Sequence, residues 1–308
     1  MQLNTLNYYL KMKKSIFLLV FSMVLFTRCK SKISPEQLKT FAPIENYPDD
    51  SFLDSVSPKK ALIFVAHDDD DCAMSGTIAR LSANGWTIKS ISLQSHEIKN
   101  TGKNPSEIIC SGNELLLEDG YYRKGLDTMK APYLPIPYDL MKEQFLTEKM
   151  SGAIIQKVNE FKPAVIFTLD NEKGGYGHPE HIFISRLVKE LFEENKLETS
   201  KIYQSVYTNS METEIVDKWL GEKIKDWGYP DPSKLANELY GIDGMPEPTV
   251  QIHITDAAET KMKYLRAYDE DVRKNLRKFI PYYEEFDAVT YFNIFDREFF
   301  RVIEKPSR

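Results

Sequence analysis

The chain has 308 residues, of which 42% are hydrophobic, so it can form a folded core and is too apolar for an intrinsically disordered chain. Its formal net charge is −6, and it becomes −10 without residues 1–28, which hold four basic residues and no acidic one. Because so acidic a surface repels phosphate backbones, these values argue against nucleic acid as a partner.

The first 28 residues have the pattern of a bacterial targeting segment. Three lysines precede an apolar run at residues 15–26, which is too short to span a bilayer comfortably. Cys29 follows Phe26-Thr27-Arg28, where a lipoprotein signal peptidase would cut, so the segment resembles a lipoprotein signal with a relaxed lipobox. This interpretation predicts a lipid anchor on Cys29 that holds the protein to a membrane of the bacterial cell envelope, on its periplasmic or outer-surface side. A signal anchor and a simple secretory peptide are the alternatives, and translation starts at either Met1 or Met12.

The remaining chain alternates between apolar strands and amphipathic helices. Residues 29–57 are rich in Ser, Pro, Lys and Asp and are expected to form a tether, and the folded domain is expected over 58–308. Strands are predicted at 61–66, 88–93, 164–169, 202–207 and 250–254, helices at 73–84, 143–161, 179–195 and 256–278, and a segment ending in a strand at 282–303. This alternation predicts an α/β, Rossmann-like fold, a mostly parallel sheet with helices on both faces and a C-terminal extension. Residues 210–245 are interpreted as an irregular cap or insert.

Two groups of metal-ligand residue types follow predicted strands. The first is Ala-His-Asp-Asp-Asp-Asp at residues 66–71, and the second is Gly-Gly-Tyr-Gly-His-Pro-Glu-His at residues 174–181. The carboxyl ends of parallel strands are where open α/β sheets bind ligands, and a catalytic zinc site uses three N or O ligands with one position left for water. Three of the five histidines lie in these groups. His96 follows a predicted strand and is expected at the surface, with a place at the mouth of the site as the alternative, and His253 is expected to be structural.

Together the two motifs resemble those of the PIG-L/LmbE family of zinc-dependent N-acetylglucosaminyl deacetylases. In that family the first motif reads Ala-His-Pro-Asp-Asp-Glu and the second His-Pro-Asp-His, and the Gly-Gly-Tyr-Gly-His-Pro sequence is similar to the branch that acts on mycothiol-type sugars. The resemblance covers about residues 58–208.

The resemblance implies a role for six residues of this chain. Zn²⁺, or another divalent metal, would be bound by three of them, namely His67, Asp70 and His181. Asp69 would act as the general base on the metal-activated water. His178 would stabilise the tetrahedral intermediate or protonate the leaving amine, and Tyr176 would polarise the scissile carbonyl.

The first motif departs from the family pattern at two positions. Asp68 replaces the family's proline and Asp71 replaces its glutamate, so the loop lacks the fixed φ of proline and other carboxylates can compete for the metal. Residues 95–111 show no clear match to the family's substrate-binding arginine, and Ala-Tyr-Asp-Glu at 267–270 stands where many members have a histidine-containing motif.

We therefore expect a zinc-dependent hydrolase that removes the acetyl group from an N-acetylated amino sugar or its conjugate. The alternatives are a non-catalytic surface lipoprotein that binds glycans, and a metal-dependent amidase or esterase with a non-sugar substrate. A thiolate zinc site is excluded because the chain has no Cys-x-x-Cys. Cys72 and Cys110 are expected to be free thiols, although a disulfide between them would be possible in an oxidising compartment.

The anchor interpretation can be tested by fractionation. Replacing Cys29 by Ser removes the thiol that would be acylated, so the variant should leave the membrane fraction while the unmodified chain stays there. Unchanged membrane retention of Cys29→Ser, measured by immunoblotting, would mean that an uncleaved leader or another attachment holds the protein.

Overall fold

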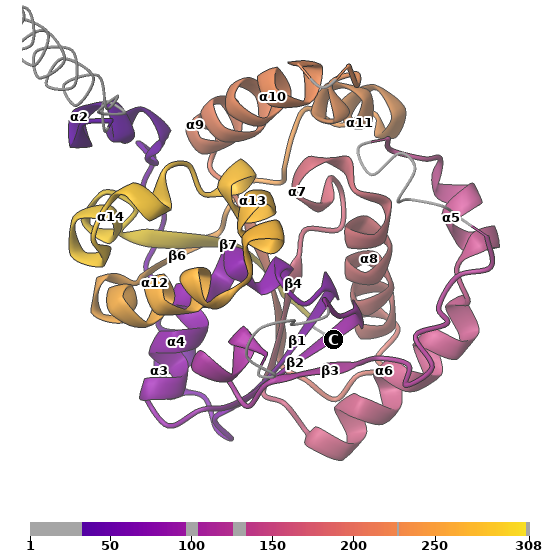
Figure 1. The fold of residues 1–308 in the computed structure, drawn as a ribbon. Coiled ribbons are helices and arrows are strands. Elements are labelled where there is room, and N and C mark those ends of the chain that lie inside the picture. The colour runs from indigo at the N-terminus through magenta and orange to yellow at the C-terminus, as the bar shows by residue number, and fades with distance from the viewer. Residues whose placement is uncertain (1–32, 97–103, 126–133, 227, 306–308) are drawn as a thin grey trace, which may run out of the picture.

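The computed structural model describes residues 33–96, 104–125, 134–226 and 228–305 (Figure 1). Cys29 and the targeting segment lie outside these residues, so the lipoprotein interpretation stays a prediction. Among the residues that the structure describes, no helix has both the length and the apolar character needed to cross a membrane.

A seven-stranded sheet forms the centre of the fold, with the strand order β3-β2-β1-β4-β5-β7-β6. The strands are β1 (Lys60–His67), β2 (Thr87–Gln94), β3 (Asn113–Leu115), β4 (Val165–Leu169), β5 (Lys201–Val206), β6 (Val250–His253) and β7 (Arg297–Glu304). Strands β1 to β5 pair in parallel, and β7 lies antiparallel between β5 and β6. The predicted α/β fold with a mostly parallel sheet is therefore confirmed.

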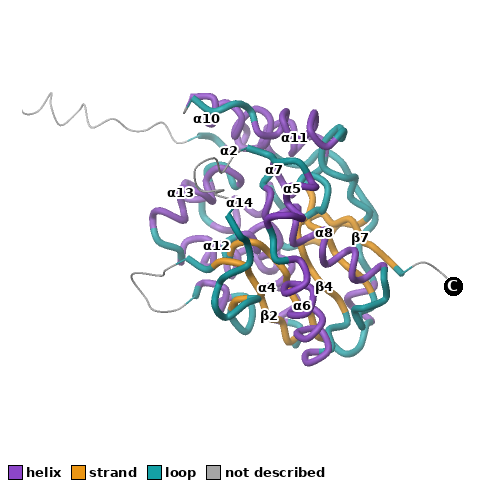
Figure 2. The backbone as a smooth tube through the Cα atoms, turned by 90° about the vertical axis from the view of Figure 1, so that its right-hand side faces the viewer, coloured by secondary structure: helices purple, strands orange, loops and turns teal. Residues whose placement is uncertain are grey.

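Strand β1 is buried on both faces, which explains its continuous apolar sequence. Ile63 and Val65 belong to one hydrophobic core, while Phe64 and Ala66 belong to the other. The first core is covered by α4 (Ser75–Ala83), α12 (Ala258–Ala267) and α14 (Ala288–Ile294), and the second by α6 (Thr147–Phe161) and α8 (Pro179–Glu193). Figure 2 shows the strands enclosed by these helices. A shorter helix, α5 (Tyr138–Gln144), precedes α6.

Most of the segment expected as a tether over residues 29–57 contains short helices that pack on the folded domain. Residues 34–57 contain α2 (Pro35–Leu38), η1 (Lys39–Phe41) and α3 (Phe52–Ser55), and Leu38 and Leu53 are buried in the first core. The segment has too few apolar side chains for a periodic pattern that sequence analysis could detect. Leu38 and Leu53 are nevertheless buried against the domain.

The predicted irregular cap at 210–245 is instead mostly helical. It consists of α9 (Asn209–Met211), the π-helix η4 (Glu212–Leu220), α10 (Gly221–Asp226) and α11 (Pro232–Tyr240), drawn in orange in Figure 1. Its Gly and Pro residues punctuate these helices: Pro232 begins α11, and Gly241 ends it with a positive φ of 65°.

The single helix predicted over 256–278 is wrong, because the chain breaks at Tyr268. The break separates α12 from α13 (Glu270–Phe279), and Asp269 caps α13 by accepting hydrogen bonds from the backbone N–H groups of Asp271 and Val272. Asp256, the expected cap, lies inside the short 3₁₀ helix η5 (Thr255–Ala257). The capping residue Asp269, which lies within the apolar pattern, thus begins a new helix directly after α12 ends.

A buried ion pair fixes the start of α4 to the rest of the fold. Glu298 of β7 accepts hydrogen bonds from the backbone N–H groups of Gly76 and Thr77, at 2.8 and 2.7 Å, and pairs with Lys261 of α12 at 2.5 Å. Because α4 follows the acidic loop at 68–71 almost directly, this pair also holds the loop in place.

Replacing Lys261 by Met should therefore destabilise the protein, because the Glu298 carboxylate stays buried without its counter-ion. We expect the free energy of unfolding in urea to fall by about 3–5 kcal/mol. In the control variant Lys218→Met, which breaks the more exposed pair with Glu214, it should fall by at most about 1 kcal/mol. Equal losses in the two variants would contradict the anchoring role.

Candidate metal and catalytic site

The two motifs meet at the carboxyl edge of the sheet. His67 is the last residue of β1, and the short helix η2 (Asp70–Met74) follows it. The second motif forms the kinked turn α7 (Gly174–Gly177) after β4 and then the start of α8. The structure thus brings together all six residues for which the sequence predicted a role, across more than 100 positions of the chain.

Three side chains point their donor atoms at one another. His67 Nδ1 lies 3.2 Å from His181 Nε2. The Asp70 carboxylate spans both rings, with Oδ1 3.2 Å from His181 Nε2 and Oδ2 3.4 Å from His67 Nδ1. Asp70 Oδ2 also accepts a hydrogen bond from the backbone N–H of His67 at 2.8 Å, which fixes the carboxylate in this orientation.

The outer nitrogen of each imidazole has its own acceptor. His67 Nε2 lies 3.0 Å from Glu180 Oε2, and His181 Nδ1 lies 3.0 Å from the carbonyl oxygen of Gly174. If both outer nitrogens donate, the inner nitrogens present lone pairs to the same point, next to a carboxylate. A Cβ atom on residue 174 would lie 2.8 Å from the Cβ of His181, so glycine is what allows this close approach.

This donor set fits a divalent metal ion. Two nitrogen lone pairs and a carboxylate repel one another unless a proton or a cation lies between them. Tetrahedral zinc with Zn–N bonds of about 2.0–2.1 Å separates its ligand atoms by about 3.3–3.4 Å, close to the 3.2 Å between His67 Nδ1 and His181 Nε2. His67, Asp70 and His181 would hold such an ion. Without one, the neighbouring imidazoles lower the pKa of Asp70 well below its usual range despite burial, and Asp70 in turn raises that of His67.

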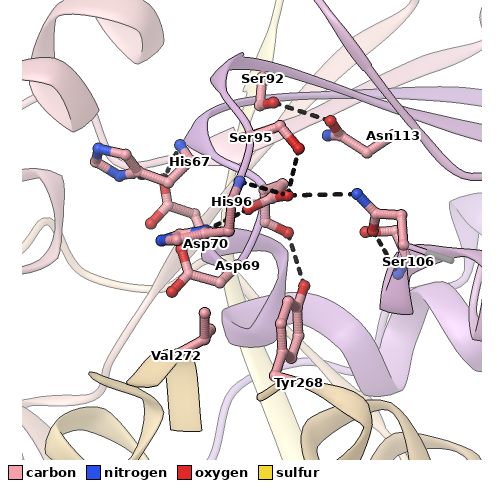
Figure 3. Close-up of polar contacts among 12 residues, drawn as sticks. His67, Asp69, Asp70, Ser92, Ser95, His96, Ser106, Asn113, Tyr268 and Val272 are labelled. Carbon is pink, nitrogen blue, oxygen red and sulfur yellow. Dashed lines mark hydrogen bonds and ion pairs between the residues drawn. The ribbon is translucent and has the colours of Figure 1, made fainter. Parts of the chain in front are cut away.

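Asp69 lies next to these three residues but has different surroundings. Its side chain is 11% exposed, and its Oδ1 lies 4.0 Å from His96 Nδ1. Burial and the adjacent charge of Asp70 raise the pKa of Asp69, which makes it a stronger base than a solvated carboxylate. Figure 3 shows Asp69 and Asp70 side by side below His67.

His178 caps helix α8. Its Nδ1 accepts a hydrogen bond from the backbone N–H of Glu180 at 3.3 Å, and Pro179 occupies the first helical position, as the sequence predicted. This bond places the proton of the neutral ring on Nε2, as a donor. Burial and the neighbouring imidazoles lower the pKa of His178 well below its usual value, so the ring stays neutral. A neutral donor suits stabilisation of an oxyanion better than protonation of an amine.

Tyr176 brings its ring to the same group of histidines. The ring centroid lies 5.5 Å from that of His181 and 5.9 Å from that of His178, both in edge-on contacts. Phe279 of α13 supports the other side of the ring at 5.0 Å. The kinked turn α7, in which Gly175 has a φ of 81°, is what turns this side chain inward.

The two unusual acids of the first motif point away from the metal ligands. Asp68 is fully buried, where it accepts hydrogen bonds from the Ser95 hydroxyl at 2.7 Å and contacts His96 Nδ1 at 2.5 Å. Asp71 is hydrogen-bonded to Ser106 and Tyr264, and burial raises its pKa to about 8. Asp68 also brings a ligand atom within 4.8 Å of those of Asp69 and His96, so the sequence-based alternative that it acts as base or ligand stays a prediction.

Several residues of the site were not found from the sequence. His96 was expected at the surface, yet its side chain is partly buried and contacts Asp68 (Figure 3). Tyr268, where the family has a histidine-containing motif, donates a hydrogen bond to the Asp68 carbonyl at 2.8 Å.

Glu180 was interpreted as part of the second motif, and the sequence assigned it no role. It is fully buried and also binds the Tyr122 hydroxyl at 2.7 Å and Arg123 at 2.8 Å. The sequence offered no signal that residues so far apart would share one carboxylate.

Fold and site together define an α/β protein with a His-Asp-His group at the carboxyl edge of its sheet. Residues 62–192 match the model of the PIG-L family, described as GlcNAc-PI de-N-acetylase.

Curated relatives match less than half of the chain. A mycothiol S-conjugate amidase of Streptomyces coelicolor is 28% identical over 152 residues, which is 43% of this chain and 50% of the relative. A 1D-myo-inositol 2-acetamido-2-deoxy-alpha-D-glucopyranoside deacetylase of Mycobacterium sp. (strain KMS) is 24% identical over 38% of this chain and 36% of its own length. The match thus spans half or less of each of these relatives.

Among solved structures, the N,N'-diacetylchitobiose deacetylase from Pyrococcus horikoshii aligns with 80% of this chain and 84% of its own, at 18% identity and a TM-score of 0.37. So low a score carries no argument about function.

The Glu180 carboxylate should determine how well the site binds metal. In Glu180→Gln the charge that holds His67 Nε2–H is lost, so we expect the affinity for Zn²⁺ to fall by about 10–100-fold. Competition with a fluorescent chelator measures this affinity. Glu190→Gln, a control on the exposed side of the same helix, should bind zinc as the unmodified chain does. Equal affinities in both variants would show that Glu180 does not position His67.

Proposed function

We propose that this protein is a metal-dependent N-deacetylase, with zinc as the preferred ion, acting on an N-acetylated amino sugar or its conjugate. The observation that carries the proposal is the convergence of His67, Asp70 and His181 at 3.2–3.4 Å, with a second carboxylate, Asp69, beside them.

A divalent ion at this position would polarise the amide carbonyl and make water a stronger nucleophile. Asp69 takes a proton from the water as its oxygen adds to the acyl carbon. His178 Nε2–H and the Tyr176 hydroxyl donate hydrogen bonds to the negative charge that develops on the carbonyl oxygen. The C–N bond then breaks, and the proton held by Asp69 passes to the leaving nitrogen. The products are a carboxylate and a free amine.

The amino-sugar substrate is supported by the relatives. One is named as a deacetylase of an acetamido-glucopyranoside and the other as an amidase of a mycothiol conjugate. Both names describe hydrolysis of an amide on a small conjugate. The second name also supports an amidase with a larger acyl group, which is one of the alternatives drawn from the sequence. A glycan-binding protein without activity is disfavoured, because binding alone has no use for a buried base beside the donor set.

Two substitutions separate metal binding from base catalysis. His181→Ala removes a ligand, so metal content measured by mass spectrometry should fall sharply. Asp69→Asn should keep its metal and lose about 10²–10⁴-fold of its acetate release, because only the general base is lost.

His253→Ala, an exposed histidine on β6, is the control and should change neither quantity. Full metal occupancy in His181→Ala would overturn the ligand assignment. Undiminished turnover in metal-loaded Asp69→Asn would mean that another group is the base.

A further inference from the structure

A cavity of about 80 Å³ opens directly from the donor set into the protein interior. Asp70, His181 and Tyr176 form one end of it. The other walls come from β4, β5, the cap helix η4, the end of α13 and the loop before β6, and they include Leu169, Val206, Val216, Met245 and Phe279.

Away from the donor set, the lining is apolar. Val206 and Val216 are almost completely buried, and Val216 packs in one cluster with Tyr176. The polar groups in this part have partners elsewhere: the Tyr207 hydroxyl donates to the carbonyl of Phe279 at 3.0 Å, and the Ser205 hydroxyl donates to the carbonyl of Ala73. The cavity is therefore charged at one end and apolar along the rest.

This distribution matches one part of an amide substrate. The carbonyl group must lie at the donor set, so the two groups attached to it leave in different directions. The amine side carries a polar sugar and needs access from solvent, where the side chains of His67 and His96 are 19% and 34% exposed. The acyl substituent has no polar atoms and loses nothing by entering an apolar cavity.

The cavity is larger than an acetyl group requires. One water molecule, similar in size to a methyl group, needs about 10–15 Å³ of such volume. A second cavity of about 60 Å³ shares the walls formed by Cys72, Ala73, Val206, Tyr207, Phe279 and Ile280. Filling this space would bury more apolar surface than acetyl offers.

We infer that this cavity is an acyl-binding subsite, and that the protein prefers amides whose acyl chain is longer than acetyl. The inference rests on the proposed function for the position of the carbonyl group, and it changes the substrate class from N-acetyl to short-chain N-acyl amines.

The first experiment measures kcat/KM of the zinc-loaded full chain on N-acetyl-, N-propionyl- and N-butanoyl-glucosamine, by release of free amine. Each methylene that enters the cavity should raise kcat/KM about fourfold, so butanoyl should exceed acetyl by about fifteenfold. Val216→Phe fills the cavity and should reduce this ratio toward one. Val289→Phe, the same change at an exposed position of α14, should leave the ratio as it is.

The second experiment does not depend on the sugar or on turnover. Butanoate and acetate, the carboxylate products, are titrated into the zinc-loaded protein by calorimetry. Butanoate should bind more tightly by a similar factor, and Val216→Phe should remove the difference. Val216→Leu, a smaller change, replaces Val216→Phe if the latter melts at a markedly lower temperature.

The outcomes separate the inference from the proposed function. Cleavage of the acetyl compound without any gain for longer chains, or an equal loss for all chain lengths in Val216→Phe, overturns the acyl subsite and leaves the deacetylase proposal intact. Tighter binding of butanoate without cleavage of any sugar amide supports the subsite and contradicts the amino-sugar substrate.

Discussion

The site depends on one buried carboxylate that stays ionised. Glu180 has no exposed surface, so its charge would be unfavourable without partners. Its partners include His67 at 3.0 Å, Tyr122 at 2.7 Å and Arg123 at 2.8 Å. Burial opposes ionisation, but the bond and charge of His67 and the charge of Arg123 outweigh it and lower the pKa of Glu180 to about 2. Because the ring of His67 is held from outside, its inner nitrogen can face the other ligands.

The four consecutive acids after β1 show how one loop supports several functions. Asp70 belongs to the donor set and Asp69 lies beside it, whereas Asp68 and Asp71 bind to the scaffold. Asp68 ties the loop to the end of β2 through Ser95 and His96, and α12 approaches it through Tyr268. In place of a proline, which would fix φ, this chain restrains the loop by a buried hydrogen-bonded network. This hydrogen-bonded network explains how the loop keeps its shape without the proline of the family pattern.

The position of the site also explains the acyl cavity. Asp70 and His181 line the cavity together with Val216 of the cap helix η4 and Phe279 of α13. Neither element belongs to the matched PIG-L domain, which ends at residue 192. The common domain thus supplies the proposed chemistry, and the later part of the chain shapes what can be bound beside it.

The sequence by itself determined the elements whose signal is local. Apolar runs, capping residues and turn glycines are each visible within about ten residues. They predicted five of the strands, the helix that begins at Pro179, and the two groups of metal-ligand residue types. The tether, the cap and the division of the helix at Tyr268 were misjudged, because short apolar segments and competing caps are decided by the surface on which they pack.

Only the tertiary structure decided which groups share one environment. Glu180 meets Arg123, Tyr268 reaches Asp68, and Val216 lies in a cavity beside His181; the residues of these three pairs are 35 to 200 positions apart. No local pattern encodes such contacts, because they arise from the packing of whole strands and helices. The sequence could therefore single out the residues of the donor set, but the orientation of their rings and the room beside them followed from the fold alone.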